Sequence, residues 1–518
     1  MAQEVLTPTV RTVADAGAAT LAAASAPPEP APPRTLPGPQ RTDWKRTAFI
    51  LLGVALFLVV YLAPPFAPAL DPKGEAFPLS REGKAALGLF FLAATWWVTE
   101  VVPIGITAIA IAVVQALFLI RPARTAFTDF WDPSVWFIFG SLMFGMVFAK
   151  TGLTRRMAYK MLTLVGERTS LIYLGCFAMT AGLTLVMAHT AVAATVFPLF
   201  LAIYALYAED STPTHFGKGL FIGMAFVAGA GSIITLLGSA RAAVAIGFFR
   251  DISGRSVGFF ELTYYMLPLG LVMVAIIWGL MLVLHPPERT TIPGLQDRVR
   301  RLYASLGPIS RGEILATLII LGTLGCLTLR PFVPALEPLD KSAIILVATL
   351  LFFLLRVVSL EDLEGTSWNI VLLFGGAMSL GLCLWQTGAA AWLAVNWLGL
   401  LHGTPWLVFV LGMAAFVLVM TNLIMNVAAI AITMPVALVI ASYVGVSADV
   451  VFYACLVTAG MPFLLLVGAA PNAIAYTSNQ FTAREFFVAG IPASLLLLAV
   501  LALFVWLIWP AMGMPVLV

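Results

Sequence analysis

Residues 262–284 have the sequence LTYYMLPLGLVMVAIIWGLMLVL, residues 48–63 have the sequence AFILLGVALFLVVYLA, and neither stretch contains a charged side chain. Bilayer-spanning helices need about 20 consecutive apolar residues, and these stretches approach that length. The whole chain of 518 residues has this character, because 61% of its residues are hydrophobic and only 10% are charged. The apolar runs are continuous rather than alternating, which excludes a β-barrel. The sequence therefore predicts an all-α polytopic membrane protein.

Two hydrophilic segments stand outside the apolar runs. Residues 1–44 are rich in Ala, Pro, Ser and Thr, and they lack the bulky apolar side chains of a folded core. We therefore expect a disordered tail. Residues 286–312 form a basic linker, with arginines at 289, 298, 300, 301 and 311. Because basic residues concentrate in cytoplasmic loops, both segments, including the N-terminus, are expected on the cytoplasmic side of the inner (plasma) membrane.

Three motifs occur twice in the same order. WFIFG at 136–140 with TGL at 151–153 matches VLLFG at 371–375 with TGA at 387–389. AHT at 188–190, leading to Pro198, matches MNV at 425–427, leading to Pro435. GSARA at 238–242 matches GAAPN at 468–472. Three ordered matches indicate an internal repeat.

The second and third motifs place polar residues inside apolar runs, which predicts broken helices in both halves. Irregular backbone at membrane depth is tolerated only where it lines a cavity or is buried in protein. Duplicated halves with matched breaks are typical of secondary transporters. The alternative is that Pro198 and Pro435 only kink helices, while His189 and Asn426 bond neighbouring helices.

The repeat divides the chain into six parts. After the tail we expect N-terminal scaffold helices at 45–130 and a first repeat at 131–285, which contains a hairpin and a broken helix. The linker at 286–312 follows. Second-half scaffold helices at 313–364 then precede a second repeat at 365–518 with the same two features.

Two ionisable side chains fall at the breaks of the first half. Ionisable residues inside a membrane are costly and usually functional. Arg241 cannot lose its proton, so it must meet an anion, a carboxylate or water. The alternatives are a neutral His189 that donates to a carbonyl group and an Arg241 that extends to the interface. Thr421 and Asn422 precede the second break and are expected to line it.

Motifs for other functions are missing from the sequence. The four cysteines lie in apolar runs without disulfide or metal spacing, which suits small core residues. We find no paired carboxylates, metalloprotease motif or phosphate-binding loop, so no catalytic residue, cofactor or nucleic-acid partner is predicted. A membrane-embedded enzyme with His189 as its base would need a carboxylate partner, and none is evident.

Residues 96–104, WWVTEVVPI, resemble the WWxTExxPI motif of the divalent anion/sodium symporter family, which includes dicarboxylate, citrate and sulfate carriers. The Phe-Gly segments, the breaks and Pro471-Asn472 follow the family's order, and the resemblance covers residues 45–515. It implies an elevator-type homodimer in the lipid bilayer. Each protomer would have two inverted repeats with about 11 transmembrane helices and two re-entrant hairpins, which we assign to the Phe-Gly segments.

The resemblance also implies a binding site made of two Ser-Asn-Thr triplets and two Thr-Pro-Pro-Asn-like turns, with sodium beside them. The matching substrate-binding positions of this sequence are Ala188, His189, Thr190, Ser239, Arg241, Met425, Asn426, Val427, Ala469, Pro471 and Asn472. The matching candidate sodium site is Thr421, Asn426 and Gly468. This sequence departs from the pattern, since His189 replaces an asparagine, Arg241 a proline and Ala469 a threonine.

The sequence thus predicts a secondary active transporter of small divalent anions. The substrate class is C4-dicarboxylate-like, with sulfate or sulfonate as further candidates. Arg241 would supply a fixed countercharge, so we expect sodium-independent anion exchange. The alternatives are a sodium-coupled dicarboxylate symporter, a sodium/proton antiporter and an arsenite-type carrier of the same superfamily.

Overall fold

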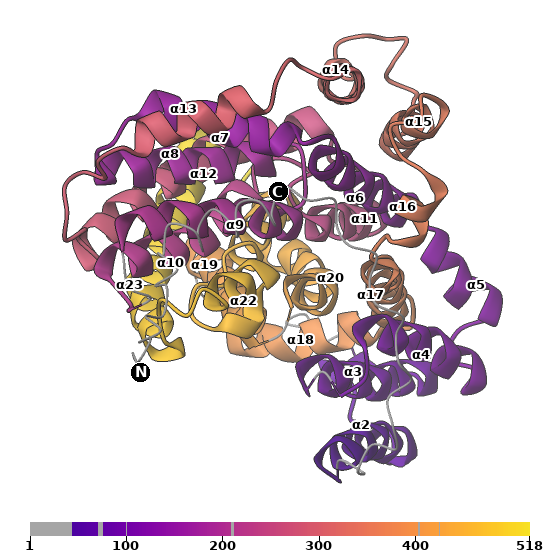
Figure 1. Cartoon of the computed structure of the whole chain (residues 1–518). Helices are drawn as coiled ribbons and strands as arrows, with labels where there is room; N and C mark the ends of the chain where they lie inside the picture. The colour runs from indigo at the N-terminus through magenta and orange to yellow at the C-terminus, as the bar shows by residue number, and fades with distance from the viewer. Residues whose placement is uncertain are drawn as a thin grey trace, which may run out of the picture.

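The computed structural model describes residues 44–70, 76–99, 101–208, 212–401, 405–423 and 425–517. The predicted tail, apart from Trp44, lies outside these residues, and so does Glu100 of the WWVTEVVPI motif. The described chain is almost entirely helical (Figure 1). Its named strands, β1 (Ala69–Leu70) and β2 (Ala76–Phe77), form one short antiparallel pair.

Nine helices of the described residues are long and apolar enough to cross a membrane. They are α2 (Trp44–Leu62), α6 (Pro133–Thr151, preceded by α5, Ala123–Thr128, and η1, Asp129–Trp131), α9 (His189–Tyr207), α12 (Phe259–Leu284), α14 (Arg311–Leu329), α17 (Trp368–Gln386), α19 (Trp406–Leu423), α20 (Asn426–Val444) and α23 (Ala483–Leu503, extended by η3, Phe504–Ile508, and α24, Trp509–Ala511). Four shorter apolar helices are α4 (Ile104–Leu117), α8 (Thr169–Thr184), α15 (Lys341–Leu354) and α21 (Ala448–Ala459). The protein is a polytopic all-α membrane protein, as predicted.

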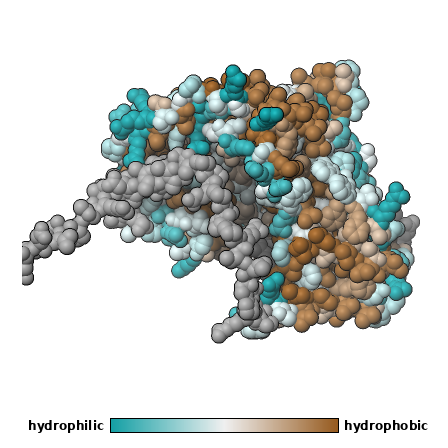
Figure 2. Space-filling model, turned by 45° about the vertical axis from the view of Figure 1, so that its right-hand side comes forward, coloured by the Kyte–Doolittle hydropathy of each residue, from teal (hydrophilic) through white to brown (hydrophobic). Residues whose placement is uncertain are grey.

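Large apolar side chains are exposed along the outer helices. Leu51 of α2, Leu318 of α14, Leu350 of α15 and Leu495 of α23 are each at least 60% exposed. Figure 2 shows broad hydrophobic areas on one face of the molecule. A surface of this kind is stable only when lipid or another protein covers it.

Helices α8 and α9 form a helical hairpin. Tyr173 near the start of α8 and Tyr207 at the end of α9 both stack on Phe216 of α10 (His215–Gly231), with ring centroids 5.2 and 4.2 Å away. The open ends of the two helices therefore meet, and residues 185–188 form the tip. In the second half, α19 and α20 pack against each other and both pack on α21.

The hairpins lie one element later than the sequence predicted. The first Phe-Gly segment is α6, which ends at Gly152 with a φ of +80° and continues as α7 (Leu153–Val165). The second is α17, which is followed at Gly388, with a φ of +75°, by α18 (Ala389–Leu401). In both halves a glycine with left-handed backbone geometry turns the chain after a helix. The repeated Phe-Gly and Thr-Gly motif therefore reflects this turn and not a hairpin. Helix α7 cannot be an apolar hairpin arm because it carries Arg155, Arg156 and Lys160.

Each half packs into the other. Helix α11 (Ala240–Ser253) of the first half packs on α20, and α22 (Ala470–Tyr476) of the second half packs on α9. In the same manner α4 packs along α17, and α15 packs along α6. In Figure 1, α9, α10, α19, α20 and α22 lie near the centre, while α2, α3 (Arg81–Thr99) and α4 form a group at the edge.

The ends of the helices group into two sides. The C-terminal residues join the α20–α21 loop, because Ser447 N donates to Val516 O at 2.8 Å. Asp449, in the first turn of α21, pairs with Arg255, which lies just before α12. Helix α12 then runs to the other side, where the linker bears α13 (Leu295–Ser305). The linker packs α13 on α7 and leads through α14 and α15 to α16 (Leu360–Glu364).

Candidate functional site

The two hairpin tips start their second helices with the same backbone geometry. Ala188 precedes α9 with φ −59° and ψ 137°, and Met425 precedes α20 with φ −55° and ψ 140°. Neither residue caps its helix with a side chain. The AHT and MNV motifs therefore occupy equivalent helix starts, in the register that their alignment predicts.

The two turn motifs also match. Ser239 precedes α11 with φ −158° and ψ 131°, and Ala469 precedes α22 with φ −153° and ψ 148°. The Ser239 side chain accepts a hydrogen bond from Arg241 N, whereas Ala469 offers no side-chain cap. Three of these four helix starts thus leave first-turn N–H groups without a side-chain acceptor. N-termini of this kind carry partial positive charge and bind anions.

Contacts of the first half bring its two helix starts together. His189 N donates to Gly238 O at 3.0 Å, which joins the start of α9 to the residue before Ser239. Thr235 Oγ1 donates to Leu185 O at 2.9 Å across the same boundary. A Cβ on Gly238 would lie 2.6 Å from Thr184 O, so only glycine permits this approach. The hairpin tip and the α10–α11 turn form one unit.

Arg241 is the central charged residue of this unit. It is fully buried, and its Nη1 and Nη2 donate to Ser239 Oγ at 2.6 Å and to Ser232 Oγ at 2.8 Å. Its Nε–H has no acceptor among the residues that the structure describes. None of the ion pairs among the described residues includes Arg241. A buried guanidinium held only by two hydroxyls has lost most of its hydration without gaining a countercharge, so the site favours an anion.

The guanidinium also reaches the second half. A Cβ on Gly460, the residue after α21, would lie 2.5 Å from Arg241 Nη2. A Cβ on Gly229 would lie 2.9 Å from Gly460 O, so the two interrupted helices α10–α11 and α21–α22 touch where each begins to unwind. Arg241 therefore lies at the boundary between the two repeats.

In the second half, asparagine side chains hold the unwound loop at residues 460–469. Asn472 Nδ2 donates to Pro462 O at 2.8 Å and to Leu465 O at 3.1 Å. Asn422 Oδ1 accepts from Leu464 N at 2.8 Å and from Leu465 N at 3.2 Å. Asn472 thus has a scaffolding role in addition to any contact with substrate.

Other polar side chains at the hairpin tips have no such partners. Asn426 is 4% exposed, and its side chain makes no hydrogen bond with a described residue. His189 is buried and its Nδ1 has no hydrogen-bond partner in the described part of the chain, while Thr190 is half-buried beside it. These three residues follow the tips directly and can bond a ligand. We expect Thr190, Asn426 and Asn472 to line one polar pocket near the middle of the membrane, and this pocket stays a prediction.

The remaining predicted positions have apolar side chains at the starts of α20 and α22. Val427 is buried in the first turn of α20, Pro471 lies in the first turn of α22, and Met425 is half-buried. For the candidate sodium site, the structure brings Thr421 and Gly468 together: a Cβ on Gly468 would lie 2.8 Å from Thr421 O. Thr421 Oγ1 donates to Ala459 O at 3.0 Å. Oxygen atoms of this kind suit a hard cation.

A buried ion pair was not predicted from the sequence. Arg121 Nη1 lies 2.7 Å from Asp129 Oδ2, and it also donates to Gln115 Oε1 at 3.1 Å and Ser379 O at 3.2 Å. This cluster joins α4 and η1 to α17 of the second half. The signal that could have revealed it is the short spacing between Arg121 and Asp129 after an apolar run. Since its charges are paired, we assign it to the scaffold.

Known proteins resemble this chain in sequence and in fold. The family model of the sodium:sulfate symporter transmembrane region matches residues 45–515. The sodium-dependent dicarboxylate transporter SdcS of Staphylococcus saprophyticus is 24% identical over 489 residues, which are 90% of this chain and 92% of that protein. SdcS of Staphylococcus aureus strain MRSA252 is also 24% identical, over 89% of this chain and 91% of that protein.

Two solved transporters share the fold. MtrF of Neisseria gonorrhoeae, described as illuminating a class of antimetabolite efflux pumps, superposes with a TM-score of 0.55 and 12% identity. The superposition covers 91% of this chain and 96% of the MtrF chain. YdaH of Alcanivorax borkumensis superposes with a TM-score of 0.50 and 14% identity, over 91% of this chain and 98% of its own. Because the family model spans nearly all of the described residues, the chain belongs to the sodium:sulfate symporter family of secondary transporters, and it is a transporter rather than an enzyme.

Proposed function

We propose that this chain carries small divalent anions of the C4-dicarboxylate type and exchanges one anion for another without sodium. The observation that carries the proposal is Arg241, a fully buried cation with no carboxylate partner among the described residues. It lies beside the starts of α9 and α11, whose N–H groups add partial positive charge. Sulfate and sulfonate present the same chemistry to such a site.

A dianion can use both halves of the site. One carboxylate would pair with Arg241, since a guanidinium forms strong bidentate contacts with carboxylates. The other would bond the unpartnered side chains at the hairpin tips, Thr190 in the first half and Asn426 in the second. The SdcS relatives, which are named dicarboxylate transporters, support this substrate class.

Exchange follows from the fixed charge. In an elevator-type carrier the hairpins and interrupted helices would move against the scaffold, and we propose this mechanism for a homodimer in the plasma membrane. An empty carrier would then have to move Arg241 through the membrane without a countercharge, which is costly. A carrier that binds an anion before each movement, inward and outward, avoids this cost. A sodium ion beside Arg241 would be repelled, because like charges a few ångströms apart in a poorly screened site cost several kcal/mol.

Sodium symport is the second candidate. The names of the SdcS relatives favour it, and so does the close approach of Thr421 and Gly468, which brings backbone and side-chain oxygen atoms together. A sodium/proton antiporter is disfavoured. The buried carboxylates of the described residues, Asp129 and Glu313, pair with Arg121 and Arg156 and lie outside the breaks.

Counterflow in proteoliposomes distinguishes the candidates. We expect labelled succinate to enter only vesicles that contain unlabelled succinate, at the same rate with and without sodium. Arg241→Ala should abolish uptake, while Arg250→Ala, which removes an arginine from the other end of α11, should retain most of it. Uptake into empty vesicles that requires a sodium gradient would refute exchange. Normal uptake by Arg241→Ala would refute the assignment of the site.

A further inference from the structure

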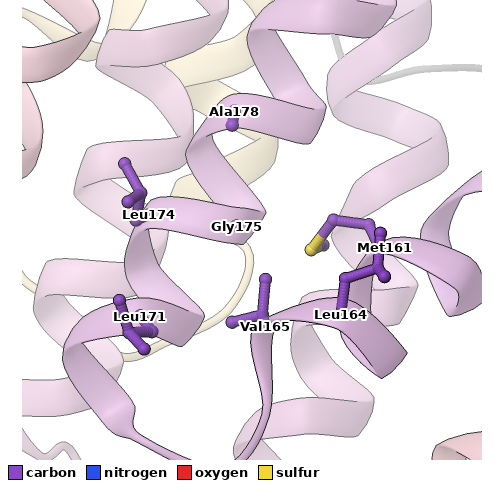
Figure 3. A pocket seen from close by; sticks show the side chains of 7 residues that line it. All are labelled: Met161, Leu164, Val165, Leu171, Leu174, Gly175 and Ala178. Carbon is purple, nitrogen blue, oxygen red and sulfur yellow. The ribbon is translucent and has the colours of Figure 1, made fainter.

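Outside the transport site, two neighbouring pockets share the first turn of α8. The first, of about 360 Å³, lies between α7 and α8. Met161 and Val165 of α7 lie against Gly175 of α8, and Leu164, Leu171, Leu174 and Ala178 complete the lining (Figure 3). Its lining is therefore hydrocarbon apart from one thioether.

The second pocket, of about 510 Å³, includes polar side chains in its lining. It lies between the start of α8 and the linker, and it is lined by Arg168, Thr169, Ser170, Pro287, Thr290 and Thr291. Ser170 of this pocket and Leu174 of the apolar pocket are four residues apart on α8, so they lie on the same face of the helix. The two pockets therefore lie next to each other along one surface, with polar side chains at the linker and apolar side chains along the helices.

Cations flank this surface. Arg168 and Lys160 are exposed, and neither takes part in an ion pair of the described residues. Two acids lie nearby and keep their negative charge: Glu167 Oε1 accepts from Gln296 N at 3.3 Å, and Glu288 Oε2 accepts from Tyr207 Oη at 2.8 Å. With the exposed Arg289 there are three cations against these two acids in residues 160–170 and 287–291, so the surface has a net positive charge next to an apolar groove.

We propose that these two pockets together bind one anionic phospholipid. Its phosphate would lie at Arg168 and the hydroxyls of Ser170 and Thr290, and an acyl chain would lie in the α7–α8 groove. A free phosphate would leave the groove empty, and an apolar molecule would leave Arg168 without a partner. The net charge of the surface selects an anionic headgroup over a zwitterionic one.

Native mass spectrometry of the full chain in detergent tests this proposal. Phosphatidylglycerol and phosphatidylcholine with identical acyl chains are titrated in turn. We expect phosphatidylglycerol to remain bound preferentially, and Arg168→Gln to weaken its binding about fivefold, the effect of about 1 kcal/mol for one cation at an anionic surface. Arg300→Gln is the matched control, because Arg300 is an exposed arginine of α13 that lines neither pocket.

A second variant tests the groove. Ala178→Trp places a bulky ring where an exposed alanine lines the apolar pocket and should also weaken phosphatidylglycerol binding at least fivefold. Leu318→Trp, at an exposed position of α14, should leave binding unchanged. Equal binding of the two lipids, or equal effects of Arg168→Gln and Arg300→Gln, would overturn the proposal. So would displacement of the lipid by millimolar inorganic phosphate together with wild-type binding by Ala178→Trp, since the pocket would then bind a free anion.

Discussion

Asn422 and Asn426 lie on either side of one hairpin tip, and their surroundings differ. Asn422 donates to Leu418 O and accepts two backbone N–H groups of the 460–469 loop, whereas Asn426 is buried without a hydrogen bond to a described residue. A buried polar group without a protein partner must find water or a ligand. The first asparagine therefore belongs to the fold, and the second is available for substrate.

Substitution of the two asparagines should separate stability from transport. Asn422→Ala leaves two loop N–H groups without acceptors, at about 1–3 kcal/mol each, and should lower the melting temperature by several degrees. Asn426→Ala should leave the melting temperature unchanged and reduce uptake at least about tenfold, the effect of about 1.4 kcal/mol. Melting curves in detergent and uptake by proteoliposomes measure both. Normal uptake by Asn426→Ala would remove this residue from the site.

Gly460 provides a second test at the residue scale. Its φ of −79° suits alanine, so any effect of Gly460→Ala comes from the new Cβ, which would lie 2.4 Å from Ile233 Cγ2 and 2.5 Å from Arg241 Nη2. The guanidinium would have to leave its bond to Ser232 Oγ, and we expect substrate affinity to fall about tenfold. Gly279→Ala of α12 is the control, since nothing lies within 4 Å of the Cβ it adds. Unchanged substrate binding by Gly460→Ala would show that the position of Arg241 does not matter.

At the residue scale the sequence predicted where the site residues lie better than it predicted their hydrogen-bond partners. Its aligned motifs place Ala188 and Met425 at equivalent helix starts, and Ser239 and Ala469 at another pair. It did not reveal that Ser232 holds Arg241, because that bond crosses an irregular turn without periodicity. The scaffolding role of Asn472 was hidden for the same reason, since its acceptors lie in the loop before it.

At the scale of elements, the linker closes the open end of the first hairpin. Glu288 Oε2 accepts from Tyr207 at the end of α9 and from Phe216 N, while Oε1 accepts from His215 N. The carboxylate therefore lies at the N-terminus of α10, where negative charge is favourable. Arg289 Nη1 donates to Tyr207 O at 3.1 Å and completes the link.

This link predicts a pH dependence of stability. Burial alone would raise the pKa of the Glu288 carboxyl, but hydrogen bonds from backbone N–H groups and the Tyr207 hydroxyl hold this pKa below its ordinary value. A lowered folded-state pKa adds stability above the unfolded pKa of about 4.3, and this stability is lost as pH falls through the folded value. Glu288→Gln should therefore lower the melting temperature at neutral pH, and the difference from wild type should shrink below about pH 4.

Melting curves between neutral pH and acid measure this effect. Glu364→Gln, at an exposed acid at the end of α16, is the control and should follow the wild-type profile. A constant difference between Glu288→Gln and wild type over the whole range would show that the carboxylate charge contributes nothing.

The hairpins show what an apolar sequence can hide about its elements. The sequence located the breaks, but it could not tell a kinked helix from a hairpin, because both have apolar arms around a polar centre. The decisive contacts, Tyr173 and Tyr207 on Phe216, are made with a third helix. The Phe-Gly motif marked the turn at Gly152. Only the charged residues of α7 indicate that this helix is not the second arm of a re-entrant hairpin.

At the scale of the whole molecule, α6 packs on α15 of the second-half scaffold helices. In an elevator mechanism we therefore expect α6 to stay with the scaffold while the first hairpin moves against it. A Cβ on Gly145 of α6 would lie 3.2 Å from Ala191 Cβ of α9, near the Cβ separation of a disulfide. In a chain whose four native cysteines are replaced, the pair Gly145→Cys and Ala191→Cys should cross-link under oxidation and abolish transport. Reduction should restore it, and each single cysteine variant should transport after oxidation. Full transport by the cross-linked chain would refute relative movement of these helices.

Topology gives a further prediction at this scale. The linker and the C-terminal residues lie at opposite sides of the helices, and we expect the linker and the N-terminus in the cytoplasm. A membrane-impermeant thiol reagent should label Leu517→Cys in intact cells and Arg300→Cys only after permeabilisation. Both side chains are exposed, so access is decided by the membrane. Labelling of both in intact cells would contradict this arrangement.

The packing of the halves into each other was beyond prediction from the sequence. The repeat implied matched elements, and the family model confirms the family, but nothing in the pattern shows that α11 packs on α20 or that α22 packs on α9. Such contacts join residues far apart in the chain, and one apolar helix surface resembles another.

The fit of Arg241 against Gly460 has a consequence for the history of the gene. A chain that arose by duplication begins with interchangeable halves, each able to pair with a copy of itself. Here the first half carries the arginine and the second carries the glycine that makes room for it. The two halves have become complementary rather than equal, and a protein assembled from two copies of either one would lack either the charge or the space. The duplication can no longer be reversed by deleting one half.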